Sequence, residues 1–323
     1  MAMPHLVFFG SSPFAAEILA HLIMNVDNFR PIAVFTRAPQ PAGRGMRLTP
    51  THCEIMAREN GIPVYTPNNW RDGEAQAQLA ALKPDLGIVV AYGMILPQAV
   101  LEVPRLGCVN LHASLLPRWR GAAPIERAIL AGDAETGVTL MQMVPRLDAG
   151  PMLADVKIPL LPHDTGGDVY RRLMEQSGIL LIHNLPKILG GELTPIPQDE
   201  NLVTYAEKID RNRDCLIDFT QPALQILRQI NAFSPHPGAF GYLGGKRCKL
   251  LAAELHSRQL NSEMGKIIIE NDELWVRCGD VPSGTPNYIQ IEKLIIEGKK
   301  TVSGADFIKY HPDYIGEIFA RDP

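Results

Sequence analysis

The sequence predicts an α/β protein with two domains: a mostly parallel sheet domain followed by a smaller, mostly β domain. Apolar strand-like runs alternate with helix-like runs through the first part, as is typical of a parallel sheet covered by helices on both faces. Beyond a proline-containing polar stretch, short apolar segments are separated by Gly, Pro and Asn-Asp turns, a pattern that favours a small barrel or sandwich. A length of 323 residues also exceeds what one core usually supports.

The alternating elements of the first domain follow in chain order. We expect strands at 5–9, 31–36, 62–66, 86–91 and 107–112, with helices at 14–25, 51–60 and 73–82. Two further strand-like segments, 136–144 and 152–158, lie close in sequence and favour an added antiparallel pair. An amphipathic helix then begins after Thr165 and ends before Gly190 and Gly191. The predicted boundaries are therefore 1–191 for the first domain, 192–207 for a linker, and 208–323 for the second domain.

Composition excludes several classes of protein. The net charge is −4, so no strong overall field attracts nucleic acid or an anionic membrane, and any polyanion site must be local. The five cysteines form no Cys-x-x-Cys pair, which disfavours a disulfide framework or a zinc knuckle. The longest uncharged stretch, between Asp85 and Glu102, is interrupted by Gly93 and Pro97 and is too short to span a membrane. We expect a soluble cytoplasmic protein without a signal peptide.

Several common catalytic motifs are missing from the sequence. The segment FFGSSPF after the first strand has only Gly10, where a dinucleotide site has three spaced glycines. There is no Walker A loop, no His-Glu-x-x-His and no Gly-x-Ser-x-Gly in the sequence. These absences disfavour a nicotinamide dehydrogenase, a phosphoryl transferase, a zinc hydrolase and a serine hydrolase.

Two polar residues, Asn110 and His112, lie two apart near the end of an apolar strand, so both side chains face the same side of the sheet. Either residue alone is more often a satisfied core group. The pair lies at the carboxyl end of a strand, where open α/β sheets bind ligands, and an amide with an imidazole can stabilise an oxyanion. Asp148, in the turn LDAG, is alone an ordinary turn residue, but it is our candidate for keeping the imidazole protonated.

These residues and their neighbours resemble the signature of a known family. The pattern Asn-x-His-x-Ser-Leu-Leu-Pro at 110–117, followed by Asp148, resembles the signature of formyltransferases that use 10-formyltetrahydrofolate. The run SLLPRWRGAAPIERAI at 114–129 is similar to the branch of that family that acts on initiator methionyl-tRNA. Further similar pieces are FFGSSPFAA, PAGRG at 41–45, and VVAYGMILP at 89–97. The resemblance implies a Rossmann-like domain followed by a C-terminal barrel of the oligonucleotide-binding (OB-like) type.

The resemblance also implies a reaction and its catalytic residues. A formyl group would pass from N10 of the folate to the α-amino group of methionine on initiator tRNA. Asn110 and protonated His112 would stabilise the oxygen that becomes anionic. Asp148 would orient His112 and help a water molecule move the proton from the amine to N10. No metal is expected.

Binding residues are carried over by the same resemblance. The folate pocket is expected to be formed by a turn and a loop, with the residues Ser114, Leu115, Leu116, Pro117, Tyr92, Gly93, Met94, Ile95, Leu96 and Pro97. Contacts with tRNA are expected from Arg44 and Arg47 in the loop after the second strand, and from Lys208 at the domain junction. Trp119, between two arginines, would either stack on a base or anchor its turn.

Two alternatives remain open from the sequence. One is a formyltransferase that acts on an amino sugar nucleotide, which would share the first domain. The runs RWRGAAPIE and PAGRG favour the tRNA branch over it. The other is an RNA-binding protein with an inactive transferase site, which the presence of Asn110, His112 and Asp148 disfavours. We expect a monomer that does not bind membranes.

Overall fold

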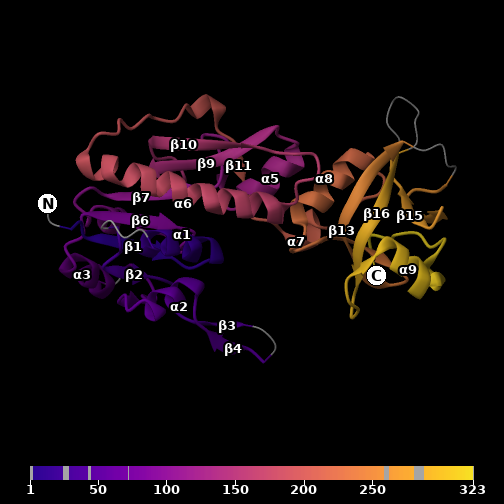
Figure 1. Cartoon of the computed structure of the whole chain (residues 1–323), viewed down its shortest axis with the longest axis horizontal. Coiled ribbons are helices and arrows are strands. Elements are labelled where there is room, and N and C mark those ends of the chain that lie inside the picture. Colours follow the sequence, from indigo (N-terminus) through magenta and orange to yellow (C-terminus); the bar gives the residue numbers. More distant parts are fainter. Residues whose placement is uncertain are drawn as a thin grey trace. The chain divides into compact units, whose positions relative to one another are not determined.

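The computed structural model describes residues 3–24, 29–42, 45–71, 73–257, 262–279 and 287–322 (Figure 1). The chain forms two compact units. Unit 1 comprises Met1–Gly121, Thr136–Ile158 and Arg171–Tyr205, and unit 2 comprises Ala122–Glu135, Pro159–Tyr170 and Ala206–Pro323. Ala122–Glu135 and Pro159–Tyr170 precede the expected linker, yet both are grouped with the C-terminal residues. The domain boundaries at 191 and 207 stay a prediction.

Unit 1 is built on a seven-stranded sheet in the order β10-β9-β7-β6-β1-β2-β5. Its strands are β1 (Leu6–Gly10), β2 (Ala33–Phe35), β5 (Val64–Tyr65), β6 (Leu86–Val90), β7 (Cys108–His112), β9 (Glu135–Gln142) and β10 (Met152–Pro159). The strands from β5 to β7 run parallel, and β9 is antiparallel to β7. The prediction of a mostly parallel, Rossmann-like sheet is confirmed.

Four helices follow the strands in the order that the sequence predicts: α1 (Pro13–Met24), α2 (His52–Glu59), α3 (Gly73–Ala81) and the long α6 (Gly166–Gly190). The short helix α4 (Gln98–Leu101) was not among the predicted elements. Thr51 caps α2, because its Oγ1 accepts a hydrogen bond from Glu54 N at 3.1 Å. A hairpin of β3 (Gln40–Ala42) and β4 (Arg47–Thr49) stands apart from the main sheet (Figure 1). No helix among the described residues has the length and apolar character needed to cross a membrane.

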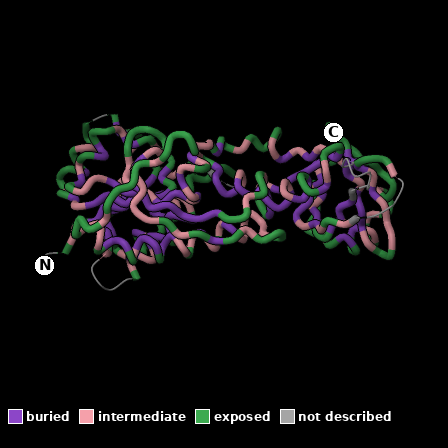
Figure 2. Tube along the Cα trace, turned by 90° about the horizontal axis from the view of Figure 1, so that it is seen from above, coloured by how far each residue is buried: buried purple, intermediate pink, exposed green. Residues whose placement is uncertain are grey.

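The core of unit 1 explains why its strands are apolar throughout. All five residues of β1 and all five of β6 are buried, because helices cover both faces of the sheet. Aromatic rings fill one side: Phe9 stacks on Phe35 at 5.3 Å between centroids and meets Tyr92 edge-on at 5.8 Å. Buried segments accordingly run through the interior of each unit (Figure 2).

Unit 2 contains a second, mostly antiparallel sheet in the order β12-β13-β16-β15-β14, with β17 paired to β16. Its strands are β12 (Ala239–Leu243), β13 (Lys246–Ser257), β14 (Ile267–Glu270), β15 (Glu273–Arg277), β16 (Asn287–Ile296) and β17 (Val302–Ser303). Its helices are α5 (Pro124–Ala131), α7 (Arg211–Asp214), α8 (Ala223–Phe233), α9 (Gly304–Tyr310) and the 3₁₀ turn η2 (Pro312–Tyr314). Two shorter strands, β8 (Arg120–Gly121) and β11 (Tyr205–Ala206), pair with each other.

The two edges of this second sheet are joined by residues near the C-terminus. Tyr242 of β12 exchanges two backbone hydrogen bonds with Ala320, at 2.9 and 2.8 Å. At the other edge, Ile267 N of β14 donates to Glu317 O at 2.9 Å. The segment 317–320 therefore satisfies backbone groups of both edge strands. The OB-like classification of this sheet stays a prediction.

Helix α5 belongs with unit 2 because its contacts are made there. Arg127 Nη2 of α5 lies 3.1 Å from Asp214 Oδ2. The guanidinium of Arg228, on α8, lies so close to Gly132 that a Cβ at that position would come within 2.1 Å of it. Gly132 also has a φ of 71° and ends α5, so glycine is favoured there by conformation, whereas a Cβ would displace only the flexible end of Arg228.

Candidate active site

Strand β7 places Asn110 and His112 at the carboxyl edge of the unit 1 sheet. Asn110 is opposite Val89 of the parallel strand β6, and His112 is opposite Thr139 of the antiparallel strand β9. His112 is 7% exposed, whereas Asn110 is half-buried. No other described residue makes a hydrogen bond to the Asn110 amide, so the amide is available to a bound molecule.

Both ring nitrogens of His112 face oxygen atoms of the protein. Nε2 lies 2.8 Å from the carbonyl oxygen of Trp119, and because a carbonyl only accepts, Nε2 carries a hydrogen. Nδ1 lies 3.7 Å from Asp148 Oδ2, within the range of an ion pair but longer than a hydrogen bond. The ring is thus held in one orientation, with a carboxylate beside the nitrogen that would carry the second proton.

Asp148 lies in a tightly constrained turn. Its Oδ2 accepts a hydrogen bond from Gly121 N at 2.9 Å, and its own φ is 45°, in the left-handed region that non-glycine residues rarely adopt. Gly150 approaches β9 so closely that a Cβ would lie 1.7 Å from the Gln142 carbonyl oxygen. The sequence LDAG therefore needs its glycine for this approach, and the turn brings the carboxylate toward His112.

The turn at 114–117, predicted to line a folate pocket, is largely held by hydrogen bonds of its own. Ser114 is fully buried, and its Oγ donates to Arg118 O at 2.7 Å. Thr139 Oγ1 donates to Ser114 O at 2.7 Å and accepts from Leu116 N at 3.1 Å. Leu116 is buried, whereas Leu115 and Pro117 are partly exposed. Ser114 and Leu116 thus shape the turn, and Leu115 and Pro117 are the side chains open to a ligand.

The loop from Tyr92 to Pro97 shows a similar division between core and surface. Tyr92 is 3% exposed, and its hydroxyl accepts a hydrogen bond from Trp70 Nε1 at 3.1 Å. Leu96 is also buried, Met94 is partly buried, and Pro97 precedes α4. Ile95, in contrast, is 87% exposed. Gly93 has a φ of 78° and allows the turn between these residues.

A cavity of about 250 Å³ lies at the same sheet edge, beside Tyr92 and Gly93. Its wall is formed by residues that follow β1, β2 and β6, together with part of the β3–β4 hairpin: Ser11, Ser12, Arg37, Gln40, Thr49, Thr51, Ala91, Tyr92 and Gly93. Sequence reasoning did not single out Ser11, and it considered Arg37 only as a basic residue of the same loop as Arg44 and Arg47, not as part of a cavity. The signal was present, because FFGSSPF follows the first parallel strand, at the edge where such sheets bind ligands.

Of the three residues expected to contact tRNA, the structure describes two, Arg47 of unit 1 and Lys208 of unit 2. Arg47 lies on β4, all of whose residues are exposed. Lys208 is exposed and belongs to unit 2. Arg44 lies outside the described residues.

Trp119 anchors its turn through backbone groups. Its N donates to Thr204 Oγ1 at 2.9 Å, its carbonyl faces His112, and the Arg118 guanidinium lies 4.3 Å from its ring centroid. The sequence left two roles open for Trp119, stacking on a base or anchoring its turn. These contacts are of the kind that anchors a turn.

The cysteines do not provide a nucleophile. All five are free and buried. Cys108, on β7 itself, is the nearest in sequence to the candidate residues, and burial raises the pKa of its thiol to about 12. A thiolate would be scarce at neutral pH, so Cys108 is a poor candidate for a nucleophile.

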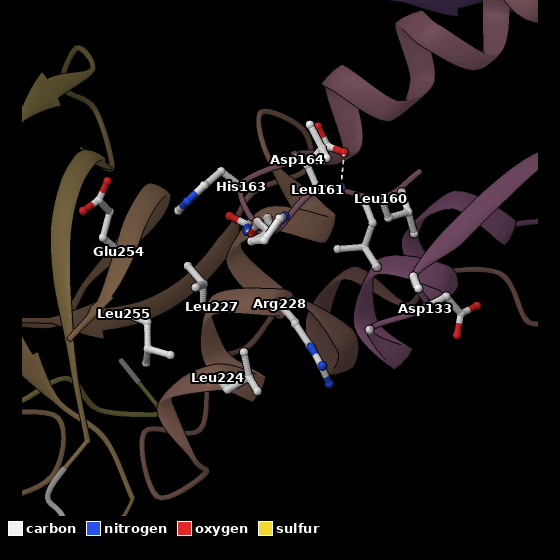
Figure 3. Close-up of a pocket in the computed structure, with 15 residues that line it drawn as sticks. Asp133, Leu160, Leu161, His163, Asp164, Leu224, Leu227, Arg228, Glu254 and Leu255 are labelled. Carbon is white, nitrogen blue, oxygen red and sulfur yellow. Dashed lines mark hydrogen bonds between the residues drawn. The ribbon is translucent and has the colours of Figure 1, made fainter. Parts of the chain in front are cut away.

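A second cavity, of about 430 Å³, lies within unit 2 among α5, α8, β13 and the loop 160–164 (Figure 3). The loop is held by a 2.6 Å hydrogen bond from Leu161 N to Asp164 Oδ2 and by Asn231 Nδ2, which donates to Pro162 O at 3.2 Å. None of the residues that the sequence predicts for catalysis or binding lines this cavity.

Comparison with known proteins identifies the family. The formyl transferase model matches residues 4–185, and the formyl transferase C-terminal domain model matches residues 209–312. The chain belongs to the formyl transferase family. A methionyl-tRNA formyltransferase of Pseudomonas putida is 45% identical over 303 residues, which is 93% of this chain and 94% of the relative. One from Magnetococcus marinus is 44% identical over 312 residues, 96% of each chain.

Two solved structures share the fold. The N-formyltransferase from Helicobacter canadensis, in complex with folinic acid and dTDP-3-aminofucose, has a TM-score of 0.67 at 19% identity and covers 90% of this chain and 100% of its own. HypX from Aquifex aeolicus, in complex with tetrahydrofolic acid, has a TM-score of 0.60 at 18% identity and covers 95% of this chain and 47% of its own.

Proposed function

We propose that this chain transfers a formyl group from 10-formyltetrahydrofolate to the α-amino group of methionine carried by initiator tRNA. The observation that supports this most directly is the placement of His112 between the Trp119 carbonyl and the Asp148 carboxylate, next to the available amide of Asn110. Relatives that are 44 and 45% identical over almost the whole chain are named methionyl-tRNA formyltransferases, which supports the same activity for this chain.

The residues can perform the chemistry of amine attack on a formyl carbon. The formyl oxygen becomes negatively charged, and the Asn110 amide can donate a hydrogen bond to it. The Nδ1 proton of a protonated His112 is not committed to Asp148, because the separation of 3.7 Å exceeds a hydrogen bond. That N–H, whose direction is fixed by the ring, can therefore donate to a formyl oxygen that binds in line with it. Asp148 keeps the charged imidazole in place and can accept, through a water molecule, the proton that the amine loses. The same water can deliver that proton to N10 of the folate as the bond between N10 and the formyl carbon breaks, which releases tetrahydrofolate.

The folate would bind against the loop 92–97 and the turn 114–117. Ile95 offers an exposed apolar surface, and Leu115 and Pro117 offer partly exposed ones, which suits a flat, largely apolar ring. For tRNA, Arg44, Arg47 and Lys208 are the proposed contacts, and the exposure of Arg47 and Lys208 leaves both accessible to phosphates. Residence in the cytoplasm and a monomeric state remain our predictions.

A transfer assay tests this proposal. Purified protein and 10-formyltetrahydrofolate are incubated separately with charged initiator tRNA, with charged elongator methionyl-tRNA and with a nucleotide-linked amino sugar. We expect formylation of the initiator, much less of the elongator, and none of the sugar. Transfer to the sugar without transfer to tRNA would show that the alternative within this family is the right one.

A further inference from the structure

We propose that Gln198 is a positioning residue for the His112–Asp148 pair, and that Glu200 and Thr204, in the same segment 198–204, belong to the active-site framework with it. This inference rests on the proposed function. It concerns a region that the sequence predicts to be a linker, and none of its residues is among the predicted site residues.

The side-chain amide of Gln198 joins three groups. Its Nε2 donates to the carbonyl oxygens of Asp148, at 2.9 Å, and Gly150, at 2.8 Å. Its Oε1 accepts from Arg120 Nε at 2.9 Å. Because two carbonyls only accept and a guanidinium only donates, the amide has one possible orientation. Gln198 therefore holds the backbone of the turn that carries the Asp148 carboxylate.

Arg120 and Glu200 hold Gln198 in place. Arg120 is fully buried, which is costly for a cation unless it is paired. Its Nη2 lies 3.0 Å from Glu200 Oε1, and the other carboxylate oxygen of Glu200 lies 2.6 Å from Arg146 Nη2. Hydrogen bonds from Arg120 and then Arg146 lower the pKa of the Glu200 carboxyl, so it is ionised at neutral pH. Arg146 belongs to the loop before Asp148, so the same network holds that loop from two sides.

The other end of the segment fixes the partner of His112 Nε2. Thr204 Oγ1 accepts from Trp119 N, and Thr204 O accepts from Arg120 N, each at 2.9 Å. These bonds set the turn whose Trp119 carbonyl faces the His112 ring and whose Gly121 N donates to Asp148. Trp119 and Asp148 both have left-handed backbones, with φ of 64° and 45°, and such conformations persist only when the surroundings impose them. Gln198 thus constrains the turn that carries the Asp148 carboxylate, and Thr204 constrains the turn that carries the Trp119 carbonyl.

The test compares three variants of the full chain. Gln198→Ala removes all three hydrogen bonds. Gln198→Glu keeps the volume and the contact with Arg120, but places a carboxylate oxygen against the carbonyls of Asp148 and Gly150. Asn201→Ala is the control, because Asn201 is exposed in the same segment and its side chain bonds only Asp199 within the described structure.

We expect both Gln198 variants to lose at least about tenfold in kcat, since small displacements of catalytic groups are costly, with KM for folate and tRNA within about twofold of wild type. Asn201→Ala should behave as wild type. Wild-type kcat in Gln198→Glu would show that only the contact with Arg120 matters and that the bonds to the Asp148 turn do not. The positioning role would then be rejected. A rise in KM with unchanged kcat would also reject it.

Hydrogen exchange supplies a readout that does not depend on turnover. The amide hydrogen of Gly121 donates to Asp148, so it should exchange at least about tenfold faster in Gln198→Glu than in wild type if Gln198 holds the turn. Unchanged exchange would contradict the inference. If wild type transferred no formyl group while this exchange still increased, the proposed function would fail and the positioning role would stand.

Discussion

Replacing Thr139 by valine removes the two hydrogen bonds that hold the turn beside His112. Thr139 is 1% exposed, and its hydroxyl donates to Ser114 O at 2.7 Å and accepts from Leu116 N at 3.1 Å. Valine has nearly the same shape, so no cavity forms, but a carbonyl and an amide N–H lose their buried partner. Each orphaned group costs about 1–3 kcal/mol, so we expect the unfolding free energy of unit 1 to fall by about 2–6 kcal/mol for the two groups.

The same strand offers a matched control. Thr136 is 3% exposed, and its Oγ1 has no hydrogen-bond partner in the part of the chain that the structure describes. Changing Thr136 to valine removes a buried polar group that gains nothing from its surroundings. We expect this variant to be neutral or more stable by up to about 1 kcal/mol, the opposite sign from Thr139→Val.

Denaturant unfolding and hydrogen exchange measure the difference. The Leu116 amide, which donates to Thr139, should exchange about 30-fold faster in Thr139→Val for a loss of about 2 kcal/mol, because each 1.4 kcal/mol is a factor of ten. In Thr136→Val its exchange should not change. If both variants shifted the unfolding midpoint equally, the hydrogen bonds of Thr139 would contribute nothing and the reasoning would be refuted.

Two further predictions concern the active site and its loop. His112→Ala should lower turnover by about 10² to 10³, measured by formyl transfer, while titration shows that folate still binds. The control is His163→Ala, which should keep wild-type turnover because His163 is an exposed histidine in unit 2. Normal turnover of His112→Ala would remove this residue from the mechanism. Burial raises the pKa of Tyr92 from 10.0 to about 12, so the stability contributed by its neutral form is complete below pH 10 and lost as the pH rises toward 12. An absorbance titration should show one tyrosine that ionises at a higher pH than the others and that is missing in Tyr92→Phe. The unfolding free energy of Tyr92→Phe should fall less steeply with pH above pH 10 than that of wild type.

The fold was predictable because burial leaves a direct trace in the sequence. Strands β1 and β6 are buried on both faces and therefore consist of continuous apolar runs. The edge position of Asn110 and His112 was likewise predictable, because alternation along a strand fixes which side chains share a face. These inferences need only local sequence and the general geometry of sheets.

The framework around His112 was not predictable for a different reason. Its ring faces a backbone carbonyl, that of Trp119, and backbone carbonyls carry no residue-specific signal. Trp119 and Asp148 adopt left-handed conformations without being glycine, so the turns have no composition that marks them. The polar residues around Gln198 resemble those of a solvated linker, and only the folded chain shows that its amide meets the Asp148 turn.

The way unit 2 joins its sheet edges has a consequence for the order of synthesis. Tyr242 and Ile267 form backbone hydrogen bonds with Ala320 and Glu317, which the ribosome adds long after both strands have been made. Until residues 317–320 emerge, β12 and β14 expose unpaired backbone groups, the usual starting point for association between chains. A nascent chain that stalls before this segment therefore leaves backbone groups unpaired at both edges of the sheet, whereas the residues that contact His112 and the Asp148 turn all lie at or before Thr204.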